Sequence, residues 1–452
     1  MSRKLLSVAC ACLVSFGALV AAPGQAVGAR SAAGREAREL STRNRLDDRR
    51  YIASGSRGYV IGTEDGRFPA MGFHTRGEMG GIWSAPLKLL DGMWFGINDE
   101  WVGPATRFTS GYGYSRLRLP SSGAVRITRT DFVPDGRRAA LIGLELSNSG
   151  DARSFTLKMD AHSELLGAYP WGATTPNQLD FNLQDTVAAS NGRLVFRERG
   201  RPHPNAEPHN WAAVVGANRT PIGESTGPDF RGPQDPAVIC PAEGDAPPRC
   251  DDTEFGKGAG GQLRFRMTMP AGSSRTVWFG VAGSERGPAA AERTLDNVLE
   301  DPARLLATKV AGRDRLARKT KISIPGDRLL ARGIEWSKQN LADSVQVATD
   351  LEVRETDTGL QYPPSEGTID RVRFLGAGFP DYPWLFGTDG EFTAFASVGV
   401  GQFGPIKDHL RALKDASLID NGNSGKVVHE VVTEGAVYFG SNDDPGNTDE
   451  TA

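Results

Sequence analysis

The sequence predicts a multidomain chain in which a large antiparallel β-sandwich is followed by a helical region. Short apolar or alternating runs bounded by turn residues recur between residues 51 and 283, for example VRITRTDF and TVWFGVAG. Such alternation places one face of a strand on a core and the other in water. The 55 glycines and 28 prolines also favour strands and turns over a helical bundle. From Gly287 onward the apolar spacing becomes helical, so the two architectures follow one another along the chain.

Length and charge limit the possible functions. The 452 residues are enough for two or three domains with sizeable cores. The formal net charge of -3 gives no basic field of the kind that binds nucleic acid. We therefore expect no nucleic-acid partner.

The N-terminus has the pattern of a secretory signal peptide. Two basic residues precede an apolar run at residues 5–22, and small residues follow in APGQAVGA. Cleavage is expected after Ala26 or Ala29, so residues 1–29 would be removed from an exported protein. A membrane anchor is the alternative, but Pro23, Gly24 and Gln25 end the run. We expect a secreted mature protein without a membrane span.

Two cysteines remain after the expected cleavage. Cys240 and Cys250 enclose the polar segment PAEGDAPPR. In an oxidising compartment a pair this close is most simply a disulfide. Metal binding is the weaker alternative, because no other Cys or His lies nearby in the sequence.

The domain boundaries follow from the change of period. We predict a sandwich over residues 30–285, linker helices over 286–325 and a helical domain over 326–452. Asp327 is a suitable N-cap for the first helix of that domain. A second helix is expected to start near Thr388, after a long non-helical segment, and a third to start at Phe403.

The stretch GFPDYPWLFGTDGEFTAF combines aromatic residues with a carboxylate at a helix start. Asp389 can accept hydrogen bonds from two sugar hydroxyls, and the helix dipole stabilises its charge. An apolar platform for a pyranose ring is available from Phe379, Tyr382, Trp384 and Phe386. The alternative is that Asp389 only caps the helix and Trp384 fills the core.

A second polar cluster follows in GKVVHEVVTEGAVYFG and the acidic end of the chain. His429 and Glu430 lie between short apolar runs, and Asp449 belongs to the ending DDPGNTDETA. The alternative for the first two is a solvated loop with a structural histidine. The acidic ending does not have the spacing of an EF-hand calcium loop.

These segments together resemble a known family. The stretch around Asp389, the IEWSKQNL helix, GKVVHEV and DPGNTDETA are similar to bacterial glycogen-debranching and amylo-α-1,6-glucosidase-like proteins. Those proteins are six-hairpin glycosidases, relatives of glucoamylase. DAHSELLGAYPWG also resembles the β-sandwich that precedes the catalytic barrel in bacterial members. The resemblance covers most of the mature chain and is most specific over residues 336–452.

The resemblance implies an antiparallel β super-sandwich, linker helices and then an (α/α)6 barrel. It implies that Trp384 and Asp389 clasp the non-reducing glucosyl unit of an α-glucan. Through less specific matches, it also places His429, Glu430 and Asp449 on loops that line the mouth of the barrel, where this glucosyl unit binds. The implied activity is hydrolysis of α-glucosidic bonds by two carboxylates, without a metal or cofactor.

The sequence departs from that family at the catalytic acid and base. In the family these carboxylates lie on later barrel helices, so this chain is expected to hold an incomplete barrel, to lack the pair and to contain no catalytic residue. The expected consequence is that the apolar faces at Phe395, Ile406 and Leu410 are partly uncovered. Two alternatives stay open: a non-enzymatic carbohydrate-binding or accessory module, and a six-hairpin enzyme for another sugar such as trehalose.

Overall fold

The computed structural model describes residues 38–69, 71, 79–170, 181–227, 230–233, 257–356, 362–379 and 382–442. The chain divides into two compact units, Met1–Glu39 and Leu40–Ala452, and the features below belong to the second. The expected signal peptide, the Cys240–Cys250 pair and Asp449 lie outside the described residues. These three expectations therefore stay predictions.

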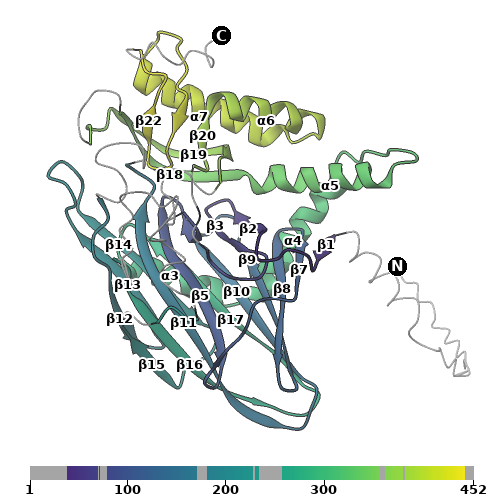
Figure 1. Cartoon of the computed structure of the whole chain (residues 1–452). Coiled ribbons are helices and arrows are strands. Elements are labelled where there is room, and N and C mark those ends of the chain that lie inside the picture. The colour runs from purple at the N-terminus through teal and green to yellow at the C-terminus, as the bar shows by residue number, and fades with distance from the viewer. Residues whose placement is uncertain are drawn as a thin grey trace, which may run out of the picture. The chain divides into compact units, whose positions relative to one another are not determined.

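Two antiparallel sheets build the sandwich (Figure 1). The nine-stranded sheet has, in spatial order, β1 (Glu39–Thr42), β7 (Arg107–Gly111), β8 (Tyr114–Ser122), β9 (Val125–Phe132), β10 (Ala139–Asn148), β17 (Ser274–Ser284), β14 (His209–Ala217), β13 (Arg193–Gly200) and β12 (Thr186–Ser190). The eight-stranded sheet has β15 (Gly223–Thr226), β16 (Gly260–Met269), β11 (Arg153–Gly167), β5 (Leu87–Ile97), β4 (Gly81–Ser84), β3 (Gly58–Thr63) and β2 (Arg50–Gly55), with β6 (Glu100–Trp101) paired to β5.

The strands form where the alternation predicts them. In β9, Val125 and Ile127 are buried while Arg126 between them is exposed. The apolar faces of the two sheets meet in one core, where the rings of Phe265 and Phe279 lie 5.6 Å apart, edge to face. Burial of this many aliphatic and aromatic side chains is the main force that holds the sheets together. The predicted β-sandwich is therefore confirmed.

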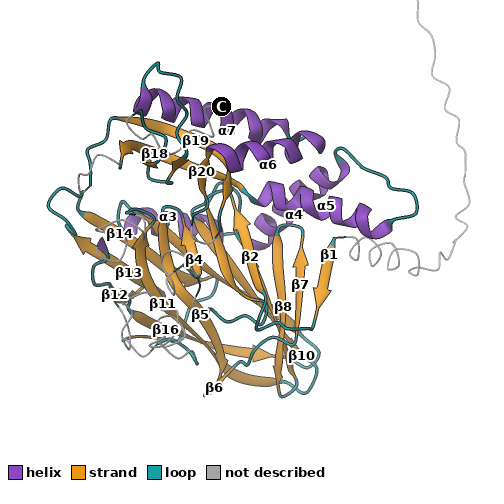
Figure 2. Cartoon of the chain, turned by 45° about the horizontal axis from the view of Figure 1, so that its top comes forward, coloured by secondary structure: helices purple, strands orange, loops and turns teal. Residues whose placement is uncertain are grey.

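Five helices lie within the described residues (Figure 2). They are α3 (Pro288–Leu299), α4 (Pro302–Arg318), α5 (Arg328–Asp343), α6 (Gly387–Gly399) and α7 (Phe403–Asn421). Helix α3 buries Leu295 and Val298 on the outer face of the nine-stranded sheet, against Val214. Asp327 caps α5 as expected, since its carboxylate accepts a 2.8 Å hydrogen bond from Leu330 N.

The segment expected to be non-helical between α5 and α6 is a β-hairpin. Strands β18 (Val345–Glu355) and β19 (Gly367–Ala377) pair along most of their length, and β20 (Trp384–Phe386), β21 (Glu430–Val431) and β22 (Ala436–Tyr438) close a small barrel with them. Helix α7 packs on this barrel through Leu413 and Ala416. Residues 321–325 have the alternating sequence KISIP but form no strand. The (α/α)6 barrel stays a prediction, and the region predicted to be helical contains a β-element that the local pattern did not reveal.

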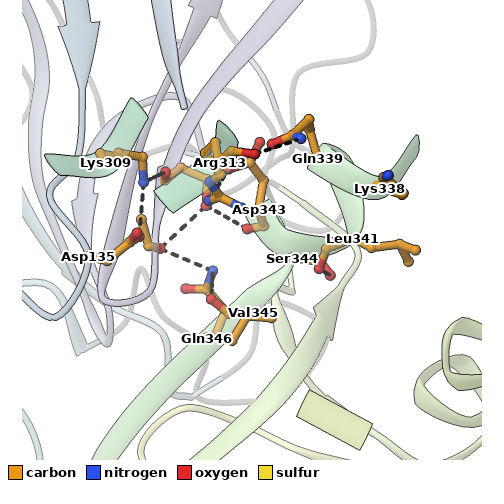
Figure 3. A network of polar contacts seen from close by, with 12 residues as sticks. Asp135, Lys309, Arg313, Lys338, Gln339, Leu341, Asp343, Ser344, Val345 and Gln346 are labelled. Carbon is orange, nitrogen blue, oxygen red and sulfur yellow. Dashed lines mark hydrogen bonds and ion pairs between the residues drawn. The ribbon is translucent and has the colours of Figure 1, made fainter. Parts of the chain in front are cut away.

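Charged side chains hold α4 against the sandwich and against α5 (Figure 3). Lys309 Nζ donates to the carbonyl of Ser54 at 2.8 Å and contacts Asp135 Oδ1 at 2.9 Å. Arg313 Nη2 contacts Asp343 Oδ1 at 2.6 Å, at the end of α5. Both cationic side chains are buried, so these contacts also satisfy charges that would otherwise be costly.

An uncovered apolar face runs along α6. Phe392 and Phe395 are 70% and 75% exposed, and Val398 is 51% exposed. Leu410 of α7 is 49% exposed, whereas Ile406 is partly buried. The expected uncovering is confirmed at Phe395 and Leu410. Contiguous exposed apolar residues of this kind favour self-association.

Replacing both Phe392 and Phe395 by serine is therefore expected to reduce self-association of the purified chain. Because both rings are mostly in water, the thermal midpoint should change little. Light scattering over a concentration series measures the first effect, and circular dichroism the second. Ile222→Ser, at a 58% exposed site on the sandwich, is the control. Equal association of the double variant and the control would contradict the prediction.

Candidate functional site

The candidate site is the start of α6, where β20 passes directly into the helix. The N-cap position is Phe386, whose side chain makes no cap hydrogen bond. Asp389 is the third helical residue and is exposed. Within the described part of the chain, its carboxylate has no hydrogen bond and no ion pair. Asp389 is thus not used as a cap, and its oxygens lie in solvent near the positive end of the helix dipole.

A buried histidine sets the position of this helix start. His409 Nε2 donates to the carbonyl of Phe386 at 2.9 Å, and Leu375 N donates to Nδ1 at 3.2 Å. Nδ1 must therefore be unprotonated, and burial agrees by lowering the pKa of His409 to about 4. Gly390 lies directly against the ring, because a Cβ there would overlap Nε2. The glycine in TDGEF is explained by this close approach.

Below the helix start lies an aromatic cluster. Its members are Tyr169, Tyr362, Tyr382, Trp384, Phe386 and Tyr438. The Trp384 ring lies between Phe386, at 6.3 Å, and Tyr438, at 6.2 Å, in near-parallel stacks. Trp384 is only 1% exposed, so in this conformation it fills a core, as the alternative reading of the sequence allowed. Phe379 is not in the cluster and packs edge to face on Tyr59 of the sandwich, at 5.1 Å.

His429 and Glu430 lie beside the start of α6. Gly387 N donates to the carbonyl of His429 at 2.8 Å, and Glu430 is the partner of Phe386 in the β20–β21 ladder. The His429 ring is partly exposed and meets Phe386 edge to face at 5.9 Å, whereas Glu430 is buried. The fold therefore brings four of the five sequence-predicted residues to one place.

Glu434, in the turn between β21 and β22, was not identified from the sequence. Its carboxylate accepts a 3.1 Å hydrogen bond from Tyr169 N, at the end of β11. Burial, and then the charge of Glu285, raise the pKa of Glu434 to about 8, against the opposing effect of Arg354. Glu434 is therefore protonated near neutral pH. In the sequence, the only indication of this buried carboxyl group was a single Glu between the apolar segments VVT and GAV.

Two features are absent from the described residues. These residues contain no group of three or more His, Cys, Asp or Glu residues arranged to hold a metal ion. Over the same residues, no helix combines the length and the apolar character needed to cross a membrane. The site therefore consists of the exposed carboxylate of Asp389, the partly exposed ring of His429 and the largely buried aromatic cluster next to the start of α6.

Comparisons with known proteins give partial likenesses at low identity. No family model matches the chain, and no curated protein matches it. A solved structure of a bacterial glucoamylase complexed with acarbose is 11% identical with a TM-score of 0.43, and the match covers 89% of this chain and 52% of that one. A protein assigned as a kojibiose phosphorylase, from the human microbiome, is 8% identical with a TM-score of 0.42, covering 69% and 42%.

A third likeness is to a family GH92 α-mannosidase from Bacteroides thetaiotaomicron. It is 12% identical with a TM-score of 0.35, and covers 72% of this chain and 40% of that one. The chain thus spans about half the length, or less, of these three proteins. At these TM-scores the likeness does not decide a family or an activity.

Proposed function

We propose that the chain belongs to a carbohydrate-active protein of the glycoside hydrolase class and recognises a non-reducing α-glucosyl unit at the start of α6. The observation that carries the proposal is Asp389, an exposed carboxylate in the first turn of α6 that has no hydrogen bond or ion pair within the described part of the chain. Such a group is positioned to accept hydrogen bonds from neighbouring sugar hydroxyls. The resemblance of residues 336–452 to glycogen-debranching and amylo-α-1,6-glucosidase-like proteins supports the same role.

Each further residue has a defined part in this proposal. The buried stack of Trp384, Phe386 and Tyr438 is a rigid floor that fixes the direction of β20 and hence the position of Asp389. The partly exposed His429 offers a second polar contact at the edge of the sugar. Glu430 and Asp449 are included on the resemblance alone.

A non-enzymatic carbohydrate-binding module is the second candidate, and one observation favours it. Inverting hydrolysis needs two carboxyl groups about 6.5–9.5 Å apart that face a water molecule. Asp389 and Glu391 are two residues apart on α6, so their side chains point to different sides of the helix. Release of glucose from maltooligosaccharides or isomaltose would favour the enzyme, and binding without release the module.

The test of the proposed site is Asp389→Asn, assayed by calorimetric titration with maltotriose and isomaltose. A charge-assisted hydrogen bond contributes about 1.5–3 kcal/mol, so affinity is expected to fall about 10- to 100-fold. Stability should change by no more than about 0.3–1 kcal/mol, the contribution of an exposed first-turn carboxylate to the helix dipole interaction. Asp415→Asn, an exposed aspartate on α7, is the matched control. Equal affinity in both variants, or no saccharide binding by the unmodified chain, would remove the proposal.

A further inference from the structure

A cavity lies away from the start of α6 and is independent of the proposed function. Its volume is about 690 Å³, within the range of small-molecule sites. It lies where α4, the end of α5, the β18–β19 hairpin and the start of α7 meet. Six basic side chains line it: Lys309, Arg313, Arg315, Lys319, Arg371 and Arg373.

The basic side chains of the cavity are only partly neutralised. Within the described part of the chain, Asp135 is the only acidic residue in the lining, and it pairs with Lys309. Arg313 pairs with Asp343 behind the wall, and Arg373 with Asp408 at 2.8 Å. Each of these three cations thus has a carboxylate partner.

The other three cations have no such partner. Arg315, Lys319 and Arg371 are exposed and form no ion pair with any described carboxylate. Three unneutralised positive charges around one cavity repel one another, and this repulsion is relieved when an anion binds between them.

The wall behind these cations is rigid. Lys309 and Arg313 are buried and are held by Asp135 and Asp343, as Figure 3 shows. The Ser54 carbonyl accepts a further hydrogen bond from Lys309. Gln339 Nε2 also donates to the Arg313 carbonyl at 3.3 Å, which ties α5 to α4. A binding site with a prearranged wall loses less entropy when a ligand is ordered in it.

The first turn of α7 contributes a further positive end. Gln402, Gly404 and Pro405 line the cavity, and the N-cap Gln402 makes no side-chain cap hydrogen bond to α7. The Gln402 amide donates instead to the Lys338 carbonyl at 3.0 Å. The open N-terminus of a 19-residue helix therefore lies at a cavity that is already basic.

Helix termini alone do not explain this arrangement. The negative end of the helix dipole favours basic residues in the last turn of α4, which contains Arg315 and Arg318. The dipole could thus account for Arg315 without any ligand. Arg318, however, does not line the cavity. Arg371 and Arg373 come from β19, where no helix dipole acts. Cations from a helix end and a strand therefore converge on one space.

We propose that this cavity binds a small molecule that carries phosphate. A phosphate dianion offsets two of the three unneutralised charges, and its oxygens accept paired hydrogen bonds from a guanidinium group. Leu305, Leu316, Val345 and Val347 supply apolar wall for the remainder of a phosphate ester. The three unpaired cations reach the phosphate group, and the buried pairs hold the wall in place.

The test is calorimetric titration of the whole chain with inorganic phosphate and with pyrophosphate. Saturable binding is expected, stronger for pyrophosphate, and sodium chloride at equal ionic strength should not reproduce it. The double variant Arg315→Ala/Arg371→Ala should bind at least 10-fold more weakly, a loss of about 1.4 kcal/mol. Arg318→Ala, on the same helix but outside the cavity, should bind like the unmodified chain.

Because all three substituted side chains are exposed, the thermal midpoints without ligand should agree, and circular dichroism checks this. Arg371→Ala alone is the second variant if the double variant is unstable. Three results would overturn the proposal: no saturable binding, an equal loss of binding in Arg318→Ala, or binding that citrate competes away as well as pyrophosphate does. The last would assign the cavity to carboxylates.

Discussion

Asp131→Ala is expected to lower the free energy of unfolding by about 3–5 kcal/mol. Asp131 is fully buried and accepts hydrogen bonds from Arg129 Nε and Nη2, both at 2.8 Å, and from the Tyr51 hydroxyl at 2.6 Å. Removing the carboxylate leaves the buried guanidinium of Arg129 without its counter-charge. The loss is large because an isolated charge inside a protein is much less favourable than a paired one.

Urea unfolding, followed by tryptophan fluorescence and circular dichroism, measures this loss. Arg286→Ala is the control, since Arg286 and its partner Asp350 are 77% and 60% exposed. An exposed ion pair contributes about 0–1 kcal/mol. If Asp131→Ala were no more destabilising than Arg286→Ala, the buried network would not hold the sandwich as described.

Glu434→Gln is expected to make the chain more stable than the unmodified protein at alkaline pH. The pKa of Glu434 is raised from its ordinary 4.5 to about 8 in the folded chain. Between these values the folded state keeps a proton that the unfolded state has released. The stability of the unmodified protein therefore falls as pH rises through this window, by up to about 1.4 kcal/mol per pH unit.

Glutamine removes this titration and still offers an oxygen to Tyr169 N. The advantage of the variant should grow by about 2–4 kcal/mol between pH 5 and pH 8 and then level off. Urea midpoints over a pH series provide the measurement, and the exposed Glu366→Gln is the control. Parallel pH profiles of the variant and the unmodified chain would show that Glu434 is ionised in the folded state.

Much of the fold followed from local sequence patterns. The alternation in β9 and the continuous apolar run in β17 predicted strands of one sandwich, and Asp327 predicted the start of α5. These features depend on side-chain period and on capping chemistry within a few residues. The small barrel could not be predicted in this way, because β18 and β19 are closed by residues 430–438, which follow much later in the chain.

The candidate site was predicted in part. The carboxylate of Asp389 at a helix start is a local feature, and the structure contains it. The burial of Trp384 is not local, because Tyr438 and Tyr169 reach it from distant segments. Glu434 has its raised pKa for the same reason: its environment includes Tyr169 and Glu285 of the sandwich.

The sequence by itself determined the strands of the sandwich, the helices and where a carboxylate meets the start of α6, since these depend on neighbouring residues. Only the tertiary structure decided how exposed each aromatic ring is and where the charges gather. Arg315, Lys319 and Arg371 are unremarkable in the sequence, the first two at a helix end and the third in a strand. They form a basic cavity only because the β18–β19 hairpin folds back beside α4, and the electrostatic energy of such a group depends on distances that no local pattern contains.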